Sequence, residues 1–393
     1  MNAMMLNPPL QINLTSSQPA GEERFDFNQR PLVVIWEVTQ ACDLKCQHCR
    51  ACAQPFRDLR ELTSVEAKRL INEVAEMGAP LFVFTGGDPL KRPDIYQLVE
   101  YAAERGVHPS LTPSATPLLT REAVARLKAS ELTRLAVSLD ASAAAIHDGF
   151  RGVPGSWQRT VDVVSWAEEV GLQLQINTTV TQRNKHDLPA IAELLNEHKI
   201  ALWSLFFLVP TGRGQLADML SAEEAEEIFG TLYKLSKQVH FHIKTTEGQH
   251  YRRFVLQQVA SARAANIRSA DAPTWRPDSR PGVNDGKGFV FISHIGDVYP
   301  SGFLPMSGGN IRQQPLAEIY RESSIFRALR DPDCLKGKCG LCEFRNICGG
   351  SRARAFAVTG DMFAPDPCCV YEPKALQMHA FGIPGVSGVG ALR

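Results

Sequence analysis

Three cysteines near the start of the chain share one short loop. Three residues separate Cys42 from Cys46, and two separate Cys46 from Cys49. This spacing lets one loop fold around a cubic iron–sulfur cluster and bond three of its four irons. No further cysteine at a usual spacing completes the set, although Cys52 lies close. The remaining iron would stay open, and an open iron can chelate an outside molecule through an amine and a carboxylate.

This loop resembles the cluster loop of radical SAM enzymes, in which a ring-bearing residue such as His48 precedes the third cysteine. The resemblance implies that Cys42, Cys46 and Cys49 are the catalytic ligands of a 4Fe–4S cluster, with S-adenosylmethionine (SAM) at the open iron. A zinc knuckle, a redox pair and a chance grouping are the alternatives. Zinc usually takes four closed ligands, and a redox pair needs no third cysteine.

A second motif ends the next predicted strand, where the run 82–85 is followed by Gly86, Gly87 and Asp88. Paired glycines permit unusual backbone angles and expose backbone oxygens. Alone, such a turn is more often a plain connection. In the family that the chain resembles, this turn holds the ammonium group of SAM, here with Asp88 in place of the more usual glutamate.

Polar residues on later strands complete the expected SAM site. Ser138 and Asp140 lie two positions apart and therefore share one face of a strand. The resemblance makes them contacts of the ribose hydroxyls and makes Arg151 the partner of the SAM carboxylate. A surface salt bridge is an equally good interpretation of Arg151. Asn177, Thr179 and residues 207–209 are adenine candidates, although core packing is the favoured interpretation of these.

A second cysteine group lies near the end of the chain. Cys339, Cys342, Cys348 and one of Cys368 and Cys369 resemble half of a SPASM domain, a small domain that binds auxiliary iron–sulfur clusters. The family pattern favours Cys369 as the fourth ligand, while Cys368 and Cys334 stay open. Ser301 and Arg352 stand where the ligands of a second auxiliary cluster belong, so we expect one auxiliary 4Fe–4S cluster. A zinc ribbon is the alternative, because zinc also accepts four thiolates.

These motifs are placed by alternating strand and helix patterns, which predict βα units around a parallel sheet. The expected strands are 32–38, 81–85, 107–112, 134–139, 173–179 and 202–208, and the expected helices include 63–78, 94–105, 121–128, 157–169 and 188–198. Six such units resemble the partial (βα)6 TIM-type barrel of radical SAM enzymes. In βα barrels chemistry sits at the carboxyl ends of the strands, and the cysteine loop follows the first strand.

The expected organisation has five parts. A disordered arm covers 1–30, the barrel core 31–215, a helical connector 216–287, the SPASM-like domain 288–375 and a flexible tail 376–393. A hairpin is expected at 288–299 and one helix at 316–329.

The amino-acid composition limits the partners and the cellular location that we expect for the protein. The 393 residues include 42 Lys plus Arg and 42 Asp plus Glu, so the charge balance indicates neither nucleic acid nor a membrane as partner. Neither a long apolar run nor a signal peptide is evident, which predicts a cytoplasmic protein. The ten cysteines therefore indicate metal ligands rather than disulfides.

The predicted activity is reductive cleavage of SAM to methionine and a 5'-deoxyadenosyl radical, which removes a substrate hydrogen. The segment from Leu335 to Asp361 resembles radical SAM proteins of alternative heme synthesis, which oxidise or decarboxylate tetrapyrrole side chains. Such chemistry needs an external one-electron donor such as flavodoxin or ferredoxin. Modification of a ribosomal peptide is the first alternative, although the amino-terminal arm is too short for a peptide-recognition domain. A non-enzymatic iron–sulfur electron carrier is the second.

Overall fold

The computed structural model describes residues 25–264 and 282–380. In this part of the chain, ten strands form one sheet in the order β10-β9-β8-β1-β2-β3-β4-β5-β6-β7. The strands are β1 (Val33–Glu37), β2 (Leu81–Thr85), β3 (His108–Leu111), β4 (Arg134–Ser138), β5 (Leu174–Val180), β6 (Leu202–Phe207), β7 (His242–Thr246), β8 (Phe289–Ile292), β9 (Asp297–Tyr299) and β10 (Gly309–Asn310). Neighbouring strands from β1 to β7 are parallel, and β1 also pairs in parallel with β8.

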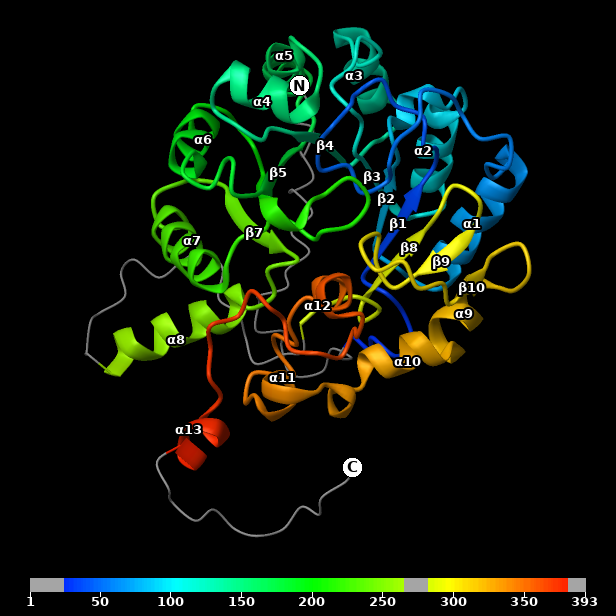
Figure 1. Ribbon diagram of the computed structural model, residues 1–393. Coiled ribbons are helices and arrows are strands. Elements are labelled where there is room, and N and C mark those ends of the chain that lie inside the picture. Colours follow the sequence, from blue (N-terminus) through cyan, green and yellow to red (C-terminus); the bar gives the residue numbers. More distant parts are fainter. Residues whose placement is uncertain (1–24, 265–281, 381–393) are drawn as a thin grey trace, which may run out of the picture.

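Helices connect these strands and cover the sheet (Figure 1). In chain order they are α1 (Ser64–Glu76), α2 (Ile95–Glu104), α3 (Arg121–Ala129), α4 (Ala144–Arg151), α5 (Ser156–Glu169), α6 (Leu188–Asn196), α7 (Ala222–Leu235), α8 (Tyr251–Ala264), α9 (Leu316–Glu322), α10 (Ser324–Arg330), α11 (Gly337–Leu341), α12 (Arg352–Thr359) and α13 (Lys374–Ala380). β1 to β6 follow one another in the sheet, which confirms the expected partial (βα)6 barrel.

The alternation of side chains along β1 shows how the sheet separates core from cavity. Val34 and Trp36 are fully buried in the hydrophobic core, whereas Val33 and Ile35 line an internal cavity. Successive residues of a strand point to opposite faces, so one face of the sheet packs against the helices and the other borders the lumen.

The region after β6 differs from the expected connector. β7 lies within 216–287 and pairs with β6, so this segment is not purely helical; residues 265–281 lie outside the described residues. β8 pairs with β1, so the sheet continues past the boundary expected at 288. β8 and β9 form the expected antiparallel hairpin. The single helix expected at 316–329 is interrupted at Ser323, whose extended backbone separates α9 from α10.

Parts of the segments expected as arm and tail belong to the described fold. Tyr320 Oη donates a hydrogen bond to the carbonyl of Phe27 at 2.7 Å, and Arg321 Nε donates to the carbonyl of Gln29 at 2.9 Å. Residues 25–30 therefore pack against α9, while residues 1–24 lie outside the described part. Residues 376–380 belong to α13, and 381–393 also lie outside.

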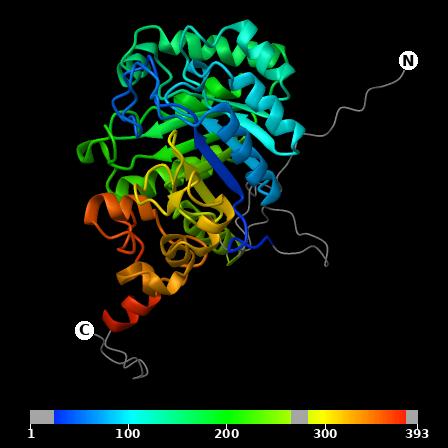
Figure 2. The ribbon, with the colours of Figure 1, turned by 90° about the vertical axis from the view of Figure 1, so that its right-hand side faces the viewer.

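The segment from α9 to α13 gathers at one end of the molecule, as the turned view shows in orange and red (Figure 2). No helix in the described ranges is long and apolar enough to cross a lipid bilayer.

Candidate active site and auxiliary cysteine group

The sheet surrounds a cavity of about 940 Å³, and the cysteine loop lies on its wall. Cys42, Cys46 and Cys49 all line this cavity, together with Gly86 and Gly87. The loop follows β1 and the glycine turn follows β2, the adjacent parallel strand, so both motifs meet at the carboxyl edge of the sheet.

Backbone hydrogen bonds join the cysteine loop to the glycine turn. Gly87 donates its N–H to the Thr39 carbonyl at 2.8 Å, and Asp88 donates to the Ala41 carbonyl at 2.6 Å. A Cβ atom added at Gly87 would lie 2.5 Å from the Ala41 carbonyl oxygen, and one at Gly86 would lie 2.5 Å from that of Thr39. The two glycines are therefore required by the close approach of the two backbones.

Helix α4 and the loop after β6 also contact the cysteine loop. Lys45 and Gln47 donate their N–H groups to the carbonyls of Arg151 and Phe150, each at 3.0 Å, and Arg213 donates to the Cys49 carbonyl at 3.0 Å. The ring of His48 packs against Phe150 with 4.6 Å between centroids. The cysteine loop is thus fixed by contacts to the carboxyl ends of α4 and β6 as well as β2.

Polar groups contact all three sulfur atoms, and at Cys49 the Ala53 N–H donates to Sγ at 3.5 Å. Cys42 Sγ lies 3.3 Å from Ser114 Oγ and accepts the Leu44 N–H at 3.4 Å, and Arg151 Nη1 donates to Cys46 Sγ at 3.7 Å. Burial raises the pKa of Cys42 to about 11 and also raises the pKa of Cys46. Buried thiols resist ionisation unless a metal takes the charge, whereas these donors suit thiolates, so the residues present fit an iron–sulfur cluster.

The expected SAM residues divide into two groups. Gly86, Gly87, Ser138 and Arg151 line the cavity, whereas Asp88 and Asp140 are fully buried and are absent from its lining. The adenine candidates Asn177, Thr179, Phe207, Leu208 and Val209 also line it. The structure therefore brings most of the predicted set together around one space.

The two buried carboxylates contact protein groups. Asp88 accepts hydrogen bonds from Thr116 Oγ1 at 2.7 Å and from the Leu90 N–H at 3.1 Å. Asp140 pairs with Arg151 at 2.5 Å and accepts the Thr179 N–H at 2.8 Å. Burial raises the pKa of Asp88 to about 6, while the Arg151 guanidinium opposes the burial of Asp140 and lowers its pKa. Asp140 therefore fixes the position of Arg151 at the cavity wall.

Sequence reasoning did not single out Ser114 or Arg213 for the site. Ser114 follows β3 and reaches both Cys42 and the carbonyl of Gly87, to which its hydroxyl donates at 2.9 Å. Arg213 lines the cavity. It follows Gly212, where an added Cβ atom would lie 2.5 Å from the Cys49 carbonyl oxygen. The only available signal was their place after a predicted strand, which many loop residues share.

The second cysteine group surrounds a hollow of about 20 Å³. Cys339, Cys342, Cys348 and Cys369 all line it, together with His250 and Asp366. Cys368 instead donates its thiol to the Leu220 carbonyl at 3.3 Å, and Cys334 contacts Asp331. Of the three cysteines left open by the sequence, Cys369 is thus the one that shares the hollow. Within residues 25–264 and 282–380, no group of three or more His, Cys, Asp or Glu side chains is arranged so that it could hold a metal ion.

The two positions that lack cysteine have other contacts. Arg352 Nη2 donates to Cys339 Sγ at 3.8 Å, and its Nη1 donates to the carbonyls of Met362 and Ala364. Ser301 lines the large cavity. Neither residue is a thiolate, so neither can serve a second auxiliary cluster as the expected ligand.

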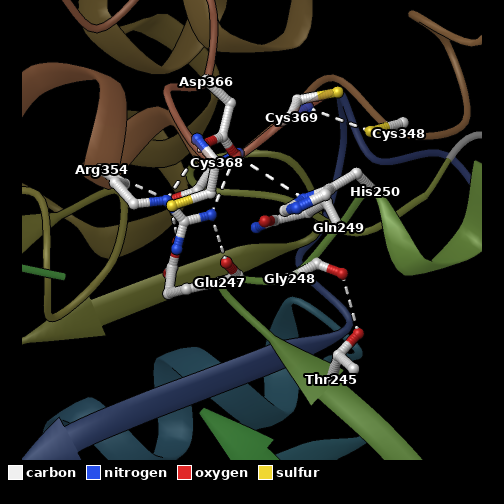
Figure 3. Close-up of polar contacts among 12 residues, drawn as sticks. Thr245, Glu247, Gly248, Gln249, His250, Cys348, Arg354, Asp366, Cys368 and Cys369 are labelled. Atoms are coloured by element: carbon white, nitrogen blue, oxygen red, sulfur yellow. Dashed lines mark hydrogen bonds and ion pairs between the residues drawn. The ribbon is translucent and has the colours of Figure 1, made fainter. Parts of the chain in front are cut away.

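Arg354, Asp366 and Glu247 belong to a buried polar network (Figure 3). Arg354 and Asp366 are both fully buried and pair at 2.9 Å. Arg354 Nη2 also donates to the Glu247 carbonyl at 2.7 Å, and Asp366 accepts the N–H of Cys368 at 3.0 Å. Glu247 lines the large cavity and Asp366 lines the hollow, so this network connects the two sites.

Comparisons with known proteins agree with this geometry. The model of the radical SAM superfamily matches residues 36–195. SuiB of Streptococcus suis bound to S-adenosylmethionine has a similar fold, with a TM-score of 0.67 and 17% identity over 87% of this chain and 78% of that one. The native anSMEcpe structure with bound AdoMet and the Cp18Cys peptide has a TM-score of 0.64 and 14% identity over 86% and 93% of the two chains.

The fold and the site therefore define a radical SAM enzyme, and the chain belongs to the radical SAM superfamily. It is 40% identical over 343 residues to the AdoMet-dependent heme synthase of Methanosarcina barkeri, covering 87% of this chain and 97% of that protein. It is 39% identical to the AdoMet-dependent heme synthase of Nitratidesulfovibrio vulgaris over 88% and 93% of the two chains. It is 30% identical to the Fe-coproporphyrin III synthase of M. barkeri over 88% and 89%. Membership implies a 4Fe–4S cluster and SAM as cofactors.

Proposed function

We propose that this enzyme oxidatively decarboxylates a propionate side chain of a tetrapyrrole in heme synthesis. Its similarity to two AdoMet-dependent heme synthases over more than nine tenths of their length carries this proposal. The cavity of about 940 Å³ has the volume for a large substrate as well as SAM.

The chain's own residues would bind and orient the reactants. Cys42, Cys46 and Cys49 hold the cluster, and the backbone of Gly86 and Gly87 contacts the SAM ammonium group.

Ser138 contacts the ribose, and Arg151 binds the SAM carboxylate with its guanidinium, which Asp140 holds in place. Asp88, which follows the two glycines, anchors the turn by accepting the Thr116 hydroxyl. When bound, the cluster and SAM supply the 5'-deoxyadenosyl radical that removes a hydrogen atom.

The remaining chemistry requires an electron acceptor. A propionate that has lost a hydrogen atom from the carbon next to the ring forms a vinyl group when its carboxylate leaves as CO₂ and one electron is removed. Cys339, Cys342, Cys348 and Cys369 would hold the acceptor, one auxiliary 4Fe–4S cluster, because four thiolates can close such a cluster. Flavodoxin or ferredoxin would reduce the SAM-binding cluster from outside.

A second candidate function is peptide modification. The chain is 29% identical to the PqqA peptide cyclase of Rhodopseudomonas palustris over 87% of its length. This relative is less similar than the heme synthases, so the tetrapyrrole remains the preferred substrate.

The proposal is tested by incubating the anaerobically reconstituted holoenzyme with SAM, dithionite and iron coproporphyrin III. We expect 5'-deoxyadenosine and porphyrin products that have lost CO₂ in matched amounts. SAM cleavage with an unchanged porphyrin would reject the tetrapyrrole as substrate, while leaving the radical SAM activity in place.

A further inference from the structure

Three arginines beside the cysteine loop line the large cavity. Arg50 directly follows Cys49, Arg151 ends α4, and Arg213 lies in the segment after β6. The carbonyl of Arg151 accepts the Lys45 N–H at 3.0 Å, and Arg213 donates its own N–H to the Cys49 carbonyl at 3.0 Å. The backbone of each arginine therefore starts from a fixed point next to the cysteine loop.

Two of these arginines have a carboxylate partner in the protein. Arg50 Nη2 pairs with Glu37 at 2.8 Å, and Arg151 Nη2 pairs with Asp140 at 2.5 Å. Glu37 and Asp140 are both buried, so their charges interact strongly with those of the arginines. The charge of each of these two arginines is thus balanced within the protein.

Arg213 has no such partner. Its half-buried guanidinium forms no ion pair and donates no hydrogen bond to any residue of 25–264 or 282–380, and its Nε and Nη2 atoms are buried without a hydrogen-bond partner. A cation that is partly removed from water and lacks an opposite charge is unfavourable. A bound anion would supply the missing charge, so Arg213 indicates an anionic ligand in the cavity.

The place of Arg213 is set by the backbone. Gly212, the preceding residue, has a φ of +60°, and an added Cβ atom there would collide with the carbonyls of Cys49 and Arg50. The segment after β6 can therefore pack directly on the cysteine loop, where Cys49 is one of the three predicted cluster ligands. The anion that Arg213 binds must lie within the length of one side chain from this loop.

We infer that Arg213 binds the carboxylate of the reacting propionate and thereby positions the carbon that loses its hydrogen atom. This inference rests on the proposed function and assigns a residue to the reacting group. Arg151 is the residue proposed for the SAM carboxylate, so the anion at Arg213 is a second one. In a propionate, two covalent bonds separate the carboxylate carbon from the carbon next to the ring. A guanidinium that binds both oxygens of the carboxylate therefore restricts the position of that carbon.

The test uses anaerobically reconstituted holoenzyme with SAM, dithionite and iron coproporphyrin III. Arg213→Gln removes the charge, whereas Arg213→Lys keeps it but loses the planar fork. Arg105→Gln is the matched control, because Arg105 lies exposed at the end of α2 and outside the cavity lining. The readouts are the dissociation constant of the porphyrin from absorbance titration, the ratio of CO₂ to 5'-deoxyadenosine, the dissociation constant of SAM and the iron content.

Arg213→Gln should weaken porphyrin binding by about 10- to 100-fold, the factor expected for a hydrogen bond to a charged group. Its ratio of CO₂ to 5'-deoxyadenosine should fall by about tenfold or more, because the carbon is no longer held in place. Arg213→Lys should lie between Arg213→Gln and the wild type, and Arg105→Gln should match the wild type. SAM binding and iron content should stay at wild-type values in all variants, which a loss of structure would not allow.

Wild-type porphyrin binding and a wild-type ratio in Arg213→Gln would overturn the inference while the proposed function stands. Weaker SAM binding with unchanged porphyrin binding would assign Arg213 to the SAM carboxylate and would also overturn it. Loss of iron from both Arg213 variants would show a structural role instead. If the wild type cleaves SAM but leaves the porphyrin unchanged, the proposed function fails and the inference fails with it.

Discussion

At the scale of single residues, Arg354 and Asp366 form a buried ion pair. Their side chains are fully buried, and Asp366 also accepts the backbone N–H groups of Ser351 and Cys368. The Arg354 guanidinium opposes the effect of burial and holds the pKa of Asp366 well below its usual range. Because water does not reach these side chains, each charge is stabilised by the opposite charge of its partner. Removing either side chain would leave the other charge buried without a partner.

Asp366→Asn should destabilise the protein by about 3–5 kcal/mol, because it leaves the Arg354 charge buried without its partner. Chemical denaturation of the holoenzyme measures this loss. The control is Arg121→Met, which breaks an exposed pair in which Arg121 and Glu169 have exposed fractions of 64% and 46%. That change should cost at most about 1 kcal/mol. Equal losses in the two variants would contradict the assignment of a stabilising role to the buried pair.

Glu247 should make the stability of the protein depend on pH. Burial, together with the nearby Asp285, raises the pKa of Glu247 to about 8 from its ordinary value of 4.5. The folded state therefore holds a proton that the unfolded state releases at lower pH, so stability falls as the pH rises from about 4.5 to about 8. In Glu247→Gln this part of the pH dependence should disappear. Thermal midpoints of the wild type and Glu247→Gln, measured across that pH range, test this expectation. Parallel curves for the two proteins would contradict a raised pKa of Glu247.

At the scale of elements, the cysteine loop depends on the loops that it contacts. Its backbone bonds to the turn after β2, to the end of α4 and to the segment after β6. The turn at Gly86 and Gly87 was predictable from sequence, but the expected reason, unusual backbone angles, does not hold, because neither glycine has a positive φ. The glycines are needed because the Thr39 and Ala41 carbonyls approach closely, which required the tertiary structure. Helix α4 was not predicted, since it contains Gly149 and begins after Ala143, which offers no side-chain cap. Yet α4 ends at Arg151 and thereby places its guanidinium beside Cys46.

Gly87→Ala should displace the cysteine loop and reduce both bound iron and SAM cleavage by at least about tenfold. The added Cβ would meet the Ala41 carbonyl at 2.5 Å, so the backbone must shift. Gly149→Ala is the matched control, because a Cβ there meets nothing within 4 Å and the residue is helical. Iron content per chain and 5'-deoxyadenosine yield are the readouts. A Gly87→Ala protein with full iron and full activity would show that the close contact is not needed.

At the scale of the whole molecule, one sheet links the cysteine loop, the lumen and the carboxyl-terminal segment. The pattern of β1 to β6 could be predicted because their apolar residues alternate or run together, as parallel strands require. β7 was missed because its sequence, His242 to Thr246, contains polar residues that face the lumen and so conceal the strand pattern. The pairing of β8 with β1 was also missed, since local sequence does not specify a contact between such distant segments.

The same limit applies to the auxiliary cysteine group. Spacing grouped Cys339, Cys342 and Cys348, but the choice among Cys334, Cys368 and Cys369 required the tertiary structure. The hollow is lined by residues of α8, α11, the segment that follows α11 and the segment before α13, and only Cys369 among the three faces it. Its role as the fourth cluster ligand remains a proposal.

The central claim is that three cysteines of one loop leave one iron free to bind SAM. The most direct measurement is the yield of 5'-deoxyadenosine from anaerobically reconstituted protein with SAM and dithionite, for Cys46→Ala and Cys52→Ala. Cys46 lines the cavity, whereas Cys52 does not. The account predicts that Cys46→Ala forms no product and that Cys52→Ala keeps at least half of the wild-type yield. Product from Cys46→Ala, or its loss in Cys52→Ala alone, would contradict the claim.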